Sequence, residues 1–176
     1  MPAIENAQFP EKLVEQIKEL TGHYPKPQAA LIPALHLIQD RFGYIPDASI
    51  DQVSVLVDVP PAEILGTLSF YTMFRRKPSG RFHINICKNL SCTLAGSRQF
   101  LAHLEEKLGV KLGETTNDGV FTLGAVECLG ACTEAPVMEI DGDYFLKLTP
   151  EKVERVLNIY RERAKSEPLN RLDELN

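Results

Sequence analysis

The chain has 176 residues, of which 44% are hydrophobic and 24% are charged, and its net charge is −5. This length can bury a substantial core, and this composition is typical of a soluble globular protein rather than of a disordered or membrane-spanning chain. The negative charge gives no general attraction to phosphate backbones, so we do not expect a nucleic-acid partner.

The first part of the chain, residues 10 to 74, predicts a small helical bundle. Apolar residues recur there at the spacing of one helix face, and Gly22 and Gly43 stand where helices would end. Pro33 must lie in the first turn of its helix or kink it. The expected helices include residues 13–20, 31–42 and 50–56, and a fourth begins at Pro60-Pro61.

The pattern changes around Lys77-Pro78-Ser79-Gly80, and the rest of the chain predicts strands and two longer helices. Apolar residues alternate from Phe82 to Cys87, as they do in a strand. Asp141-Gly142 is a strong signal for a two-residue hairpin, and Thr149-Pro150 is typical of a helix N-terminus. In chain order we expect a strand at 82–87, a helix at roughly 94–108, strands at 120–126, 137–140 and 144–148, and a final helix from residue 150.

This order of elements predicts the topology of a thioredoxin-like fold. The first strand, the helix and the second strand can form a right-handed crossover with parallel strands, and the hairpin can extend the sheet antiparallel. We therefore expect an α+β chain with a mixed sheet: an N-terminal helical domain at 1–78, a thioredoxin-like βαβββα domain at 79–165, and a polar C-terminal tail at 166–176.

Four cysteines in two pairs are the main functional clue. Cys87 and Cys92 are separated by four residues, and Cys128 and Cys132 by three. Each pair follows a predicted parallel strand, and loops that leave the C-terminal ends of neighbouring parallel strands open at the same sheet edge. We therefore expect one site that contains four sulfurs.

Several kinds of site compete for these sulfurs. A structural zinc ion usually takes its thiolates from knuckles with two intervening residues, and neither pair has that spacing. A thiol–disulfide oxidoreductase would normally show Cys-x-x-Cys at the start of the helix after the first strand. Four unconnected buried cysteines are the remaining alternative. The four histidines, His23, His36, His83 and His103, have no cysteine or carboxylate partner at ligand spacing, so we do not expect them to bind metal.

A [2Fe–2S] cluster fits the spacing better, because each iron takes two thiolates from a loop wide enough to accommodate inorganic sulfide as well. Gly130 can let backbone N–H groups approach the sulfides. Glu127 and Glu134 flank the second pair, whereas Lys88 is the cation within the first loop. We therefore expect a low reduction potential.

The residues around the second pair resemble those of a known family. The segment Glu127 to Cys132, which reads ECLGAC, and the following Thr133 to Pro136 are similar to the thioredoxin-like [2Fe–2S] subunit of NADH:quinone oxidoreductase, which is respiratory complex I. Gly43 to Pro46 and Ser69 to Phe74 agree with the helical half of that family. The resemblance covers roughly residues 10 to 163.

This resemblance implies roles for the four cysteines and a host complex. Cys87 and Cys92 would bind one iron, and Cys128 and Cys132 the other. The cluster would exchange single electrons with the FMN of a neighbouring flavoprotein subunit that oxidises NADH. Other peripheral subunits of complex I would be further partners. Similar subunits of NAD-linked hydrogenases and formate dehydrogenases are the alternative.

Two further expectations concern the chain itself. It contains neither the G-x-G-x-x-G fingerprint nor a P-loop, so we expect FMN and NADH only on the partner and no complete active site here. Without an apolar run of roughly 18 residues or a signal peptide, we expect a cytoplasmic protein that is peripheral to the inner membrane. Pro136 stands where thioredoxin-like folds often carry a cis proline. We expect a cis bond there, with a trans turn proline as the alternative.

Overall fold

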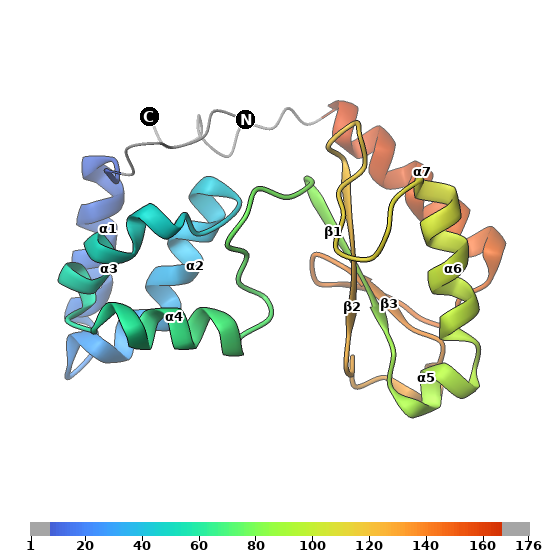
Figure 1. Cartoon of the computed structure of the whole chain (residues 1–176), viewed down its shortest axis with the longest axis horizontal. Coiled ribbons are helices and arrows are strands. Elements are labelled where there is room, and N and C mark those ends of the chain that lie inside the picture. The colour runs from blue at the N-terminus through green and yellow to red at the C-terminus, as the bar shows by residue number, and fades with distance from the viewer. Residues whose placement is uncertain (1–7, 167–176) are drawn as a thin grey trace. The chain divides into compact units, whose positions relative to one another are not determined.

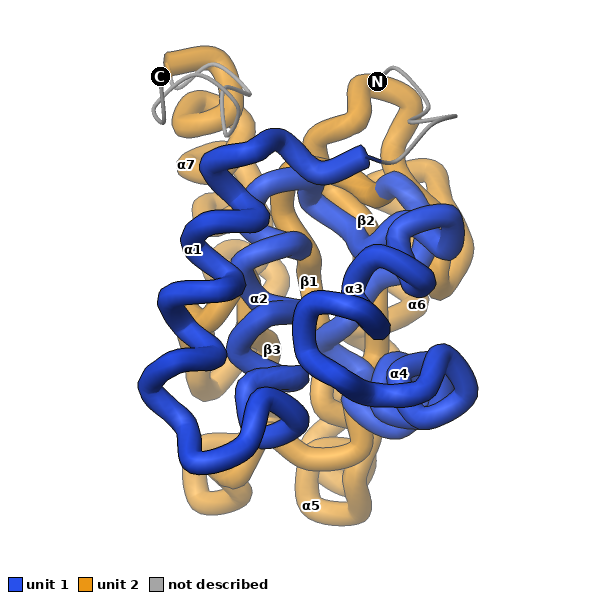
Figure 2. Tube along the Cα trace, turned by 90° about the vertical axis from the view of Figure 1, so that its left-hand side faces the viewer, with its two compact units in different colours: residues 1–78, 170–176 blue, residues 79–169 orange. Residues whose placement is uncertain are grey.

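The computed structural model of the chain describes residues 8–166. These residues divide into two compact units, one that ends at Pro78 and one that begins at Ser79 (Figure 2). The C-terminal tail expected from residue 166 onward lies outside the described residues, apart from Ser166, which ends the last helix.

The first unit consists of four α-helices joined by short turns and 3-10 helices, as the apolar spacing predicts (Figure 1). Their buried side chains form one core, in which Leu35 and Ile38 are fully covered. Pro33 lies in the first turn of its helix, where proline removes no hydrogen bond. The helices are α1 (Glu11–Gly22), α2 (Leu31–Phe42), α3 (Ile50–Val57) and α4 (Pro61–Phe70).

No helix among residues 8–166 is by itself long and apolar enough to cross a membrane. One bent pair of segments, Asp47–Val57 and Pro61–Phe70, passes the same test of length and composition when taken together. The inward residues of this pair, among them Val53 and Ile64, belong to the core of the first unit.

The second unit contains a four-stranded sheet and three helices. β1 and β2 are parallel, and their registers align Cys87 with Val126, the last residue of each strand. β3 pairs antiparallel with β1 and with β4, so the strand order is β2-β1-β3-β4. This confirms the predicted crossover and the mixed sheet. The elements are β1 (Phe82–Cys87), α5 (Leu90–Leu94), α6 (Ser97–Leu108), β2 (Phe121–Val126), β3 (Met138–Ile140), β4 (Asp143–Phe145) and α7 (Pro150–Ser166).

The segment after β1 departs from the prediction in one respect. The helix expected from about residue 94 to 108 is present as α6, which begins at Ser97, but a short helix that was not expected, α5, precedes it, and Gly96 at φ 98° separates the two. Glycine adopts this left-handed conformation without steric cost, so the chain can turn there. As a result, Cys92 lies within the short helix α5 instead of in an open loop. The fourth strand also ends early, at Phe145 instead of Leu148.

The turn and cap signals were correct. Asp141 and Gly142 both have positive φ, 47° and 98°, as a type I′ hairpin requires. The N–H of Lys152 donates to Thr149 Oγ1 at 3.2 Å, so Thr149 caps α7. The Ala135–Pro136 peptide bond is cis, which confirms that expectation.

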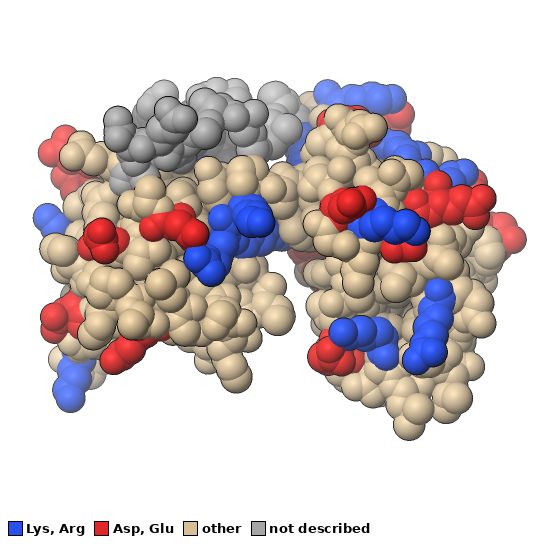
Figure 3. Space-filling view, in the orientation of Figure 1, with Lys and Arg blue, Asp and Glu red and all other residues tan. Residues whose placement is uncertain are grey.

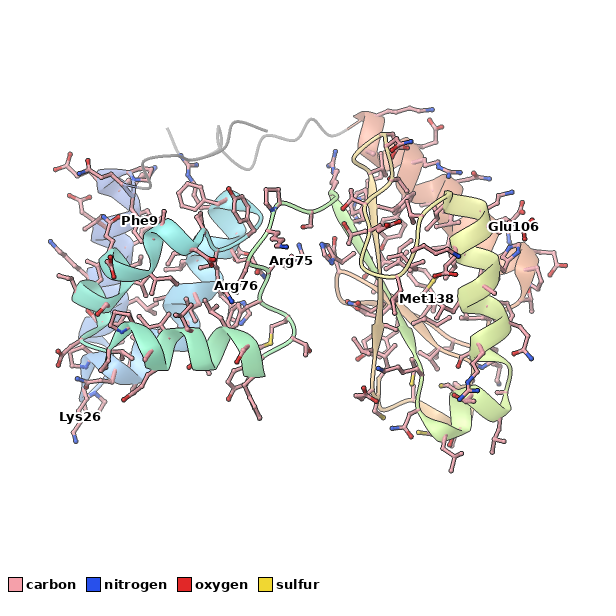
Figure 4. The ribbon with its side chains drawn as sticks, in the orientation of Figure 1. Phe9, Lys26, Arg75, Arg76, Glu106 and Met138 are labelled. Atoms are coloured by element: carbon pink, nitrogen blue, oxygen red, sulfur yellow. The ribbon has the colours of Figure 1, made fainter. Side chains whose placement is uncertain are left out.

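The core of the second unit lies between the sheet and the helices α6 and α7, which cover the same face of the strands (Figure 1). Alternate residues of β1 point into it, including Ile84 and Ile86. Met138 of β3 is fully buried and extends from the sheet toward α6 (Figure 4). Since this core fixes the strands, it also fixes where the cysteines at the strand ends lie.

Gly80 is required by packing rather than by backbone conformation. A Cβ atom at this position would lie 2.6 Å from the carbonyl carbon of Phe121, and the N–H of Gly80 donates to Thr122 Oγ1 at 2.6 Å. We predict that Gly80→Ala destabilises the second unit by about 1–3 kcal/mol, because the strand backbone must move. The shift of the urea denaturation midpoint of the full chain measures this effect.

Gly66→Ala is the matched control for that substitution. Gly66 lies inside α4, and a Cβ atom there would meet no atom within 4 Å. Alanine should therefore be neutral or stabilise the helix by about 0.5–1 kcal/mol. Equal midpoints for the two variants would contradict the packing role of Gly80.

Candidate metal centre

The first cysteine pair lies under the surface at the end of β1. Cys87 is the last residue of the strand, Cys92 lies in α5, and each residue is only 2% exposed. The two cysteines and the fully buried Val137 form a small cluster, and partly buried apolar side chains, among them Leu129 and Leu146, pack against it. Asn89 begins α5 by accepting a hydrogen bond from the N–H of Leu90 at 2.7 Å. The thiols of Cys92 and Cys87 are joined by a hydrogen bond.

Backbone N–H groups converge on the sulfur of Cys87. Burial alone would raise the pKa of the Cys87 thiol, but the backbone N–H groups of Asn89 and Leu129, together with the Cys92 thiol, outweigh burial and lower this pKa. Burial and the hydrogen bond with Cys87 raise the pKa of Cys92. The site is thus arranged to stabilise negative charge on a sulfur.

The second cysteine pair lies on a loop after β2 and is exposed. Cys128 follows the strand closely, and Cys132 begins a short 3-10 helix, Cys132–Glu134. Gly130 has φ 73°, and its N–H donates to Cys128 Sγ at 3.3 Å. The predicted role of Gly130, to let backbone N–H groups approach the inorganic sulfides, stays a prediction; the contact in this structure is with a cysteine sulfur.

The two loops meet, as the parallel topology predicts. Leu129, from the second loop, donates its N–H to the sulfur of Cys87 in the first. The Cys87 thiol contacts the carbonyl of Glu127 at 3.9 Å. Cys132 lies close enough to Cys92 to raise its pKa by charge repulsion. None of the four cysteines forms a disulfide.

The geometry can be compared with the two kinds of metal site considered from the sequence. Among residues 8–166, no group of three or more His, Cys, Asp or Glu side chains is placed to hold a single metal ion. A [2Fe–2S] cluster does not need such a group, because each iron takes two protein thiolates and shares inorganic sulfides with the other. Two thiol pairs with N–H donors directed at sulfur fit this requirement.

Ion pairs at the second loop are the feature that sequence reasoning missed. Lys88 Nζ lies 2.8 Å from Glu127 Oε1, and Lys147 Nζ lies 2.9 Å from Glu134 Oε2. The sequence shows the two glutamates only as negative charges beside the cluster. The position of Lys88 next to Cys87 in the sequence could have indicated the ion pair between Lys88 and Glu127. Nothing in the sequence places Lys147 near Glu134. Because both ion pairs offset a glutamate charge, they remove part of the reason for expecting a low reduction potential.

The chain is similar to known proteins over most of its length. The family described as thioredoxin-like [2Fe–2S] ferredoxin matches residues 17–161. The second of the E subunits of NADH-quinone oxidoreductase in Rhizobium meliloti (strain 1021) is 41% identical over 84% of this chain and 88% of its own length. The corresponding E subunit of Aquifex aeolicus (strain VF5) is 35% identical over 87% of this chain and 96% of its own length.

Solved structures show a similar arrangement of the chain. A crystal structure of an NAD⁺-reducing [NiFe]-hydrogenase in the air-oxidised state matches with a TM-score of 0.65 and 25% identity. The match covers 77% of this chain and 23% of the hydrogenase chain, so this chain corresponds to a minor part of that larger protein.

Proposed function

Because the chain belongs to the family of thioredoxin-like [2Fe–2S] ferredoxins, we propose that it is the electron-carrying subunit of an NADH:quinone oxidoreductase, a redox enzyme complex. Cys87 and Cys92 would bind one iron of a single [2Fe–2S] cluster, and Cys128 and Cys132 would bind the other. One observation carries this proposal. The two cysteine pairs follow two neighbouring parallel strands and lie at one edge of the sheet. There, a backbone N–H of the second cysteine loop donates to a sulfur of the first cysteine loop.

The chain's own residues have distinct roles in this function. When bound, the cluster supplies one-electron oxidation and reduction. The N–H groups of Asn89, Leu129 and Gly130 stabilise the negative charge on the sulfur ligands. The first cysteine pair is covered by apolar side chains, whereas the second is exposed. We therefore infer that an electron partner approaches from the side of Cys128 and Cys132.

The partner in this proposal is a flavoprotein subunit that binds FMN and NADH. The relatives, named as subunits of NADH-quinone oxidoreductase, support membership of a multi-subunit complex. The match to an NAD⁺-reducing hydrogenase supports a link to nicotinamide chemistry. The cluster would exchange single electrons with FMN at low potential. Other peripheral subunits would complete the assembly at the cytoplasmic face of the inner membrane.

The same site would also serve an NAD-linked hydrogenase or formate dehydrogenase. The structural match to the NAD⁺-reducing [NiFe]-hydrogenase is the observation that supports a hydrogenase as the second candidate. Affinity purification of the tagged chain from its own organism separates the two. Recovery of hydrogenase or formate dehydrogenase subunits in place of complex I subunits would reject the first assignment.

Metal analysis tests the cofactor directly. We expect about two irons and two acid-labile sulfides per chain after anaerobic purification, with visible absorbance that bleaches on reduction and an EPR signal after dithionite treatment. One colourless zinc ion per chain would instead indicate a zinc-stabilised interaction module. Dithiol turnover that survives anaerobic chelation would indicate a thiol–disulfide enzyme.

A further inference from the structure

Two ion pairs enclose the second cysteine loop at its two ends. Glu127, directly before Cys128, pairs with Lys88, and we call this the entry pair. Glu134, which ends the 3-10 helix after the loop, pairs with Lys147, and we call this the exit pair. Both carboxylates that flank the loop in sequence are therefore matched by a lysine from a different segment (Figure 3 shows how acidic and basic side chains adjoin on one face of the molecule).

The entry pair links the two cysteine loops to each other. Lys88 follows Cys87, and its backbone N–H donates to the carbonyl of Val126 at 3.0 Å, so the lysine leaves β1 beside the end of β2. The side chains of Lys88 and Glu127 are 50% and 80% exposed. The ammonium and the carboxylate thus lie in a solvated position beside the site, where their charges are screened but not removed.

The exit pair is supported by the backbone as well as by the side chains. The N–H of Lys147 donates to the carbonyl of Glu134 at 2.7 Å, and the N–H of Leu148 donates to the carbonyl of Pro136 at 3.1 Å. Lys147 has φ 47°, a left-handed conformation that is uncommon for a residue with a side chain. The segment after β4 is therefore held against the end of the cysteine loop, and it carries a positive charge there.

We propose that Lys88 and Lys147 tune the reduction potential by cancelling the charges of Glu127 and Glu134. This inference rests on the proposed function, in which the four cysteines hold a [2Fe–2S] cluster. One-electron reduction breaks no bond and adds a negative charge to a cluster that is already anionic. A nearby carboxylate makes this reduction less favourable, and an ammonium group paired with the carboxylate offsets that effect. The lysines therefore keep the potential higher than the glutamates alone would allow.

Redox titration of the full, anaerobically purified chain tests this proposal. The ratio of reduced to oxidised cluster is followed by EPR at the wild-type midpoint potential. We expect Lys147→Met and Lys88→Met to lower this ratio about two- to fivefold, the size of effect that a screened surface charge exerts. Glu134→Gln should raise the ratio, because it leaves the charge of Lys147 unmatched.

Companion variants separate charge from structure. Lys147→Arg keeps the charge and should keep the wild-type ratio, and the double variant Lys147→Met with Glu134→Gln should return close to it. The changes in the ratio of reduced to oxidised cluster should all become smaller as the ionic strength rises, because salt screens surface charges. A purely structural role of the ion pairs would predict the same loss for the double variant as for the single ones, which would overturn the proposal.

Lys107→Met is the matched control. Lys107 Nζ pairs with Glu154 Oε1 at 2.7 Å and is partly exposed, but it lies in the last turn of α6. A helix of this length spans roughly 18 Å, so the lysine is far from the end of α6 that follows Cys92. Its removal should leave the redox ratio unchanged.

The outcomes distinguish this inference from the proposed function. A wild-type chain without iron and sulfide rejects the function. A loaded wild-type chain whose ratio stays the same in Lys147→Met and Lys88→Met rejects the tuning role alone. If the Lys147→Met variant loses its iron, the Glu134→Gln variant becomes the test. A raised ratio of reduced to oxidised cluster in that variant supports the tuning role, and an unchanged ratio overturns it.

Discussion

Replacement of Cys128 by serine is expected to remove most of the bound iron and to change the visible and EPR spectra of what remains. Serine keeps the size of the side chain, but its hydroxyl does not ionise as a thiol does, so one of four thiolate ligands is lost. The N–H of Gly130, which donates to the Cys128 sulfur, would then face a neutral hydroxyl oxygen in place of a thiolate. Iron and sulfide analysis with EPR after dithionite treatment measures the effect.

The fold should survive this substitution. Cys128 is exposed and lies outside both large hydrophobic cores, so its replacement leaves no buried cavity. Far-UV circular dichroism should therefore match the wild type. Ser91→Ala is the control, since Ser91 neighbours Cys92 in α5 without being a proposed ligand. Unchanged cluster spectra in Cys128→Ser would contradict the assignment of the site.

The second large effect is expected from Phe121→Ala in the core of the second unit. Phe121 is fully buried, its ring centroid lies 6.2 Å from that of Phe82, and Arg161 lies over the ring at 5.8 Å. Truncation to alanine should cost about 3–5 kcal/mol, from lost burial and the cavity that remains. Since Phe121 begins β2, and β2 leads to the second cysteine loop, cluster loss should accompany unfolding of this unit.

Leu35→Ala in α2 is the counterpart in the first unit. Leu35 is also fully buried, but it belongs to a separate core. We expect a cost of about 2–5 kcal/mol, visible as loss of helical signal, while the cluster absorbance melts near the wild-type temperature. Thermal melts followed both at a helical wavelength and in the visible range compare the two variants. Identical loss of cluster absorbance in both would show that the two cores do not unfold separately.

Local signals in the sequence predicted most elements of the fold. The two-residue period of β1, the Asp141-Gly142 turn and the Thr149-Pro150 helix start each depend on a few neighbouring residues, and each was correct. The helix expected from about residue 94 to 108 is present as α6, but the short helix α5 before it was not expected, and the left-handed Gly96 separates the two. Periodicity reports which residues face a core, and it does not report whether the helix between them is continuous.

By itself, the sequence determined the chemistry proposed for this protein. The spacing of its two cysteine pairs and their positions after strands depend only on chain order, and they favour [2Fe–2S] over zinc or a redox disulfide. The tertiary structure decided the surroundings of the sulfurs: the N–H of Leu129 directed at Cys87, and the pairing of Glu134 with Lys147. These contacts join segments that are far apart along the chain, and such contacts exist only once the sheet has brought its strand ends together.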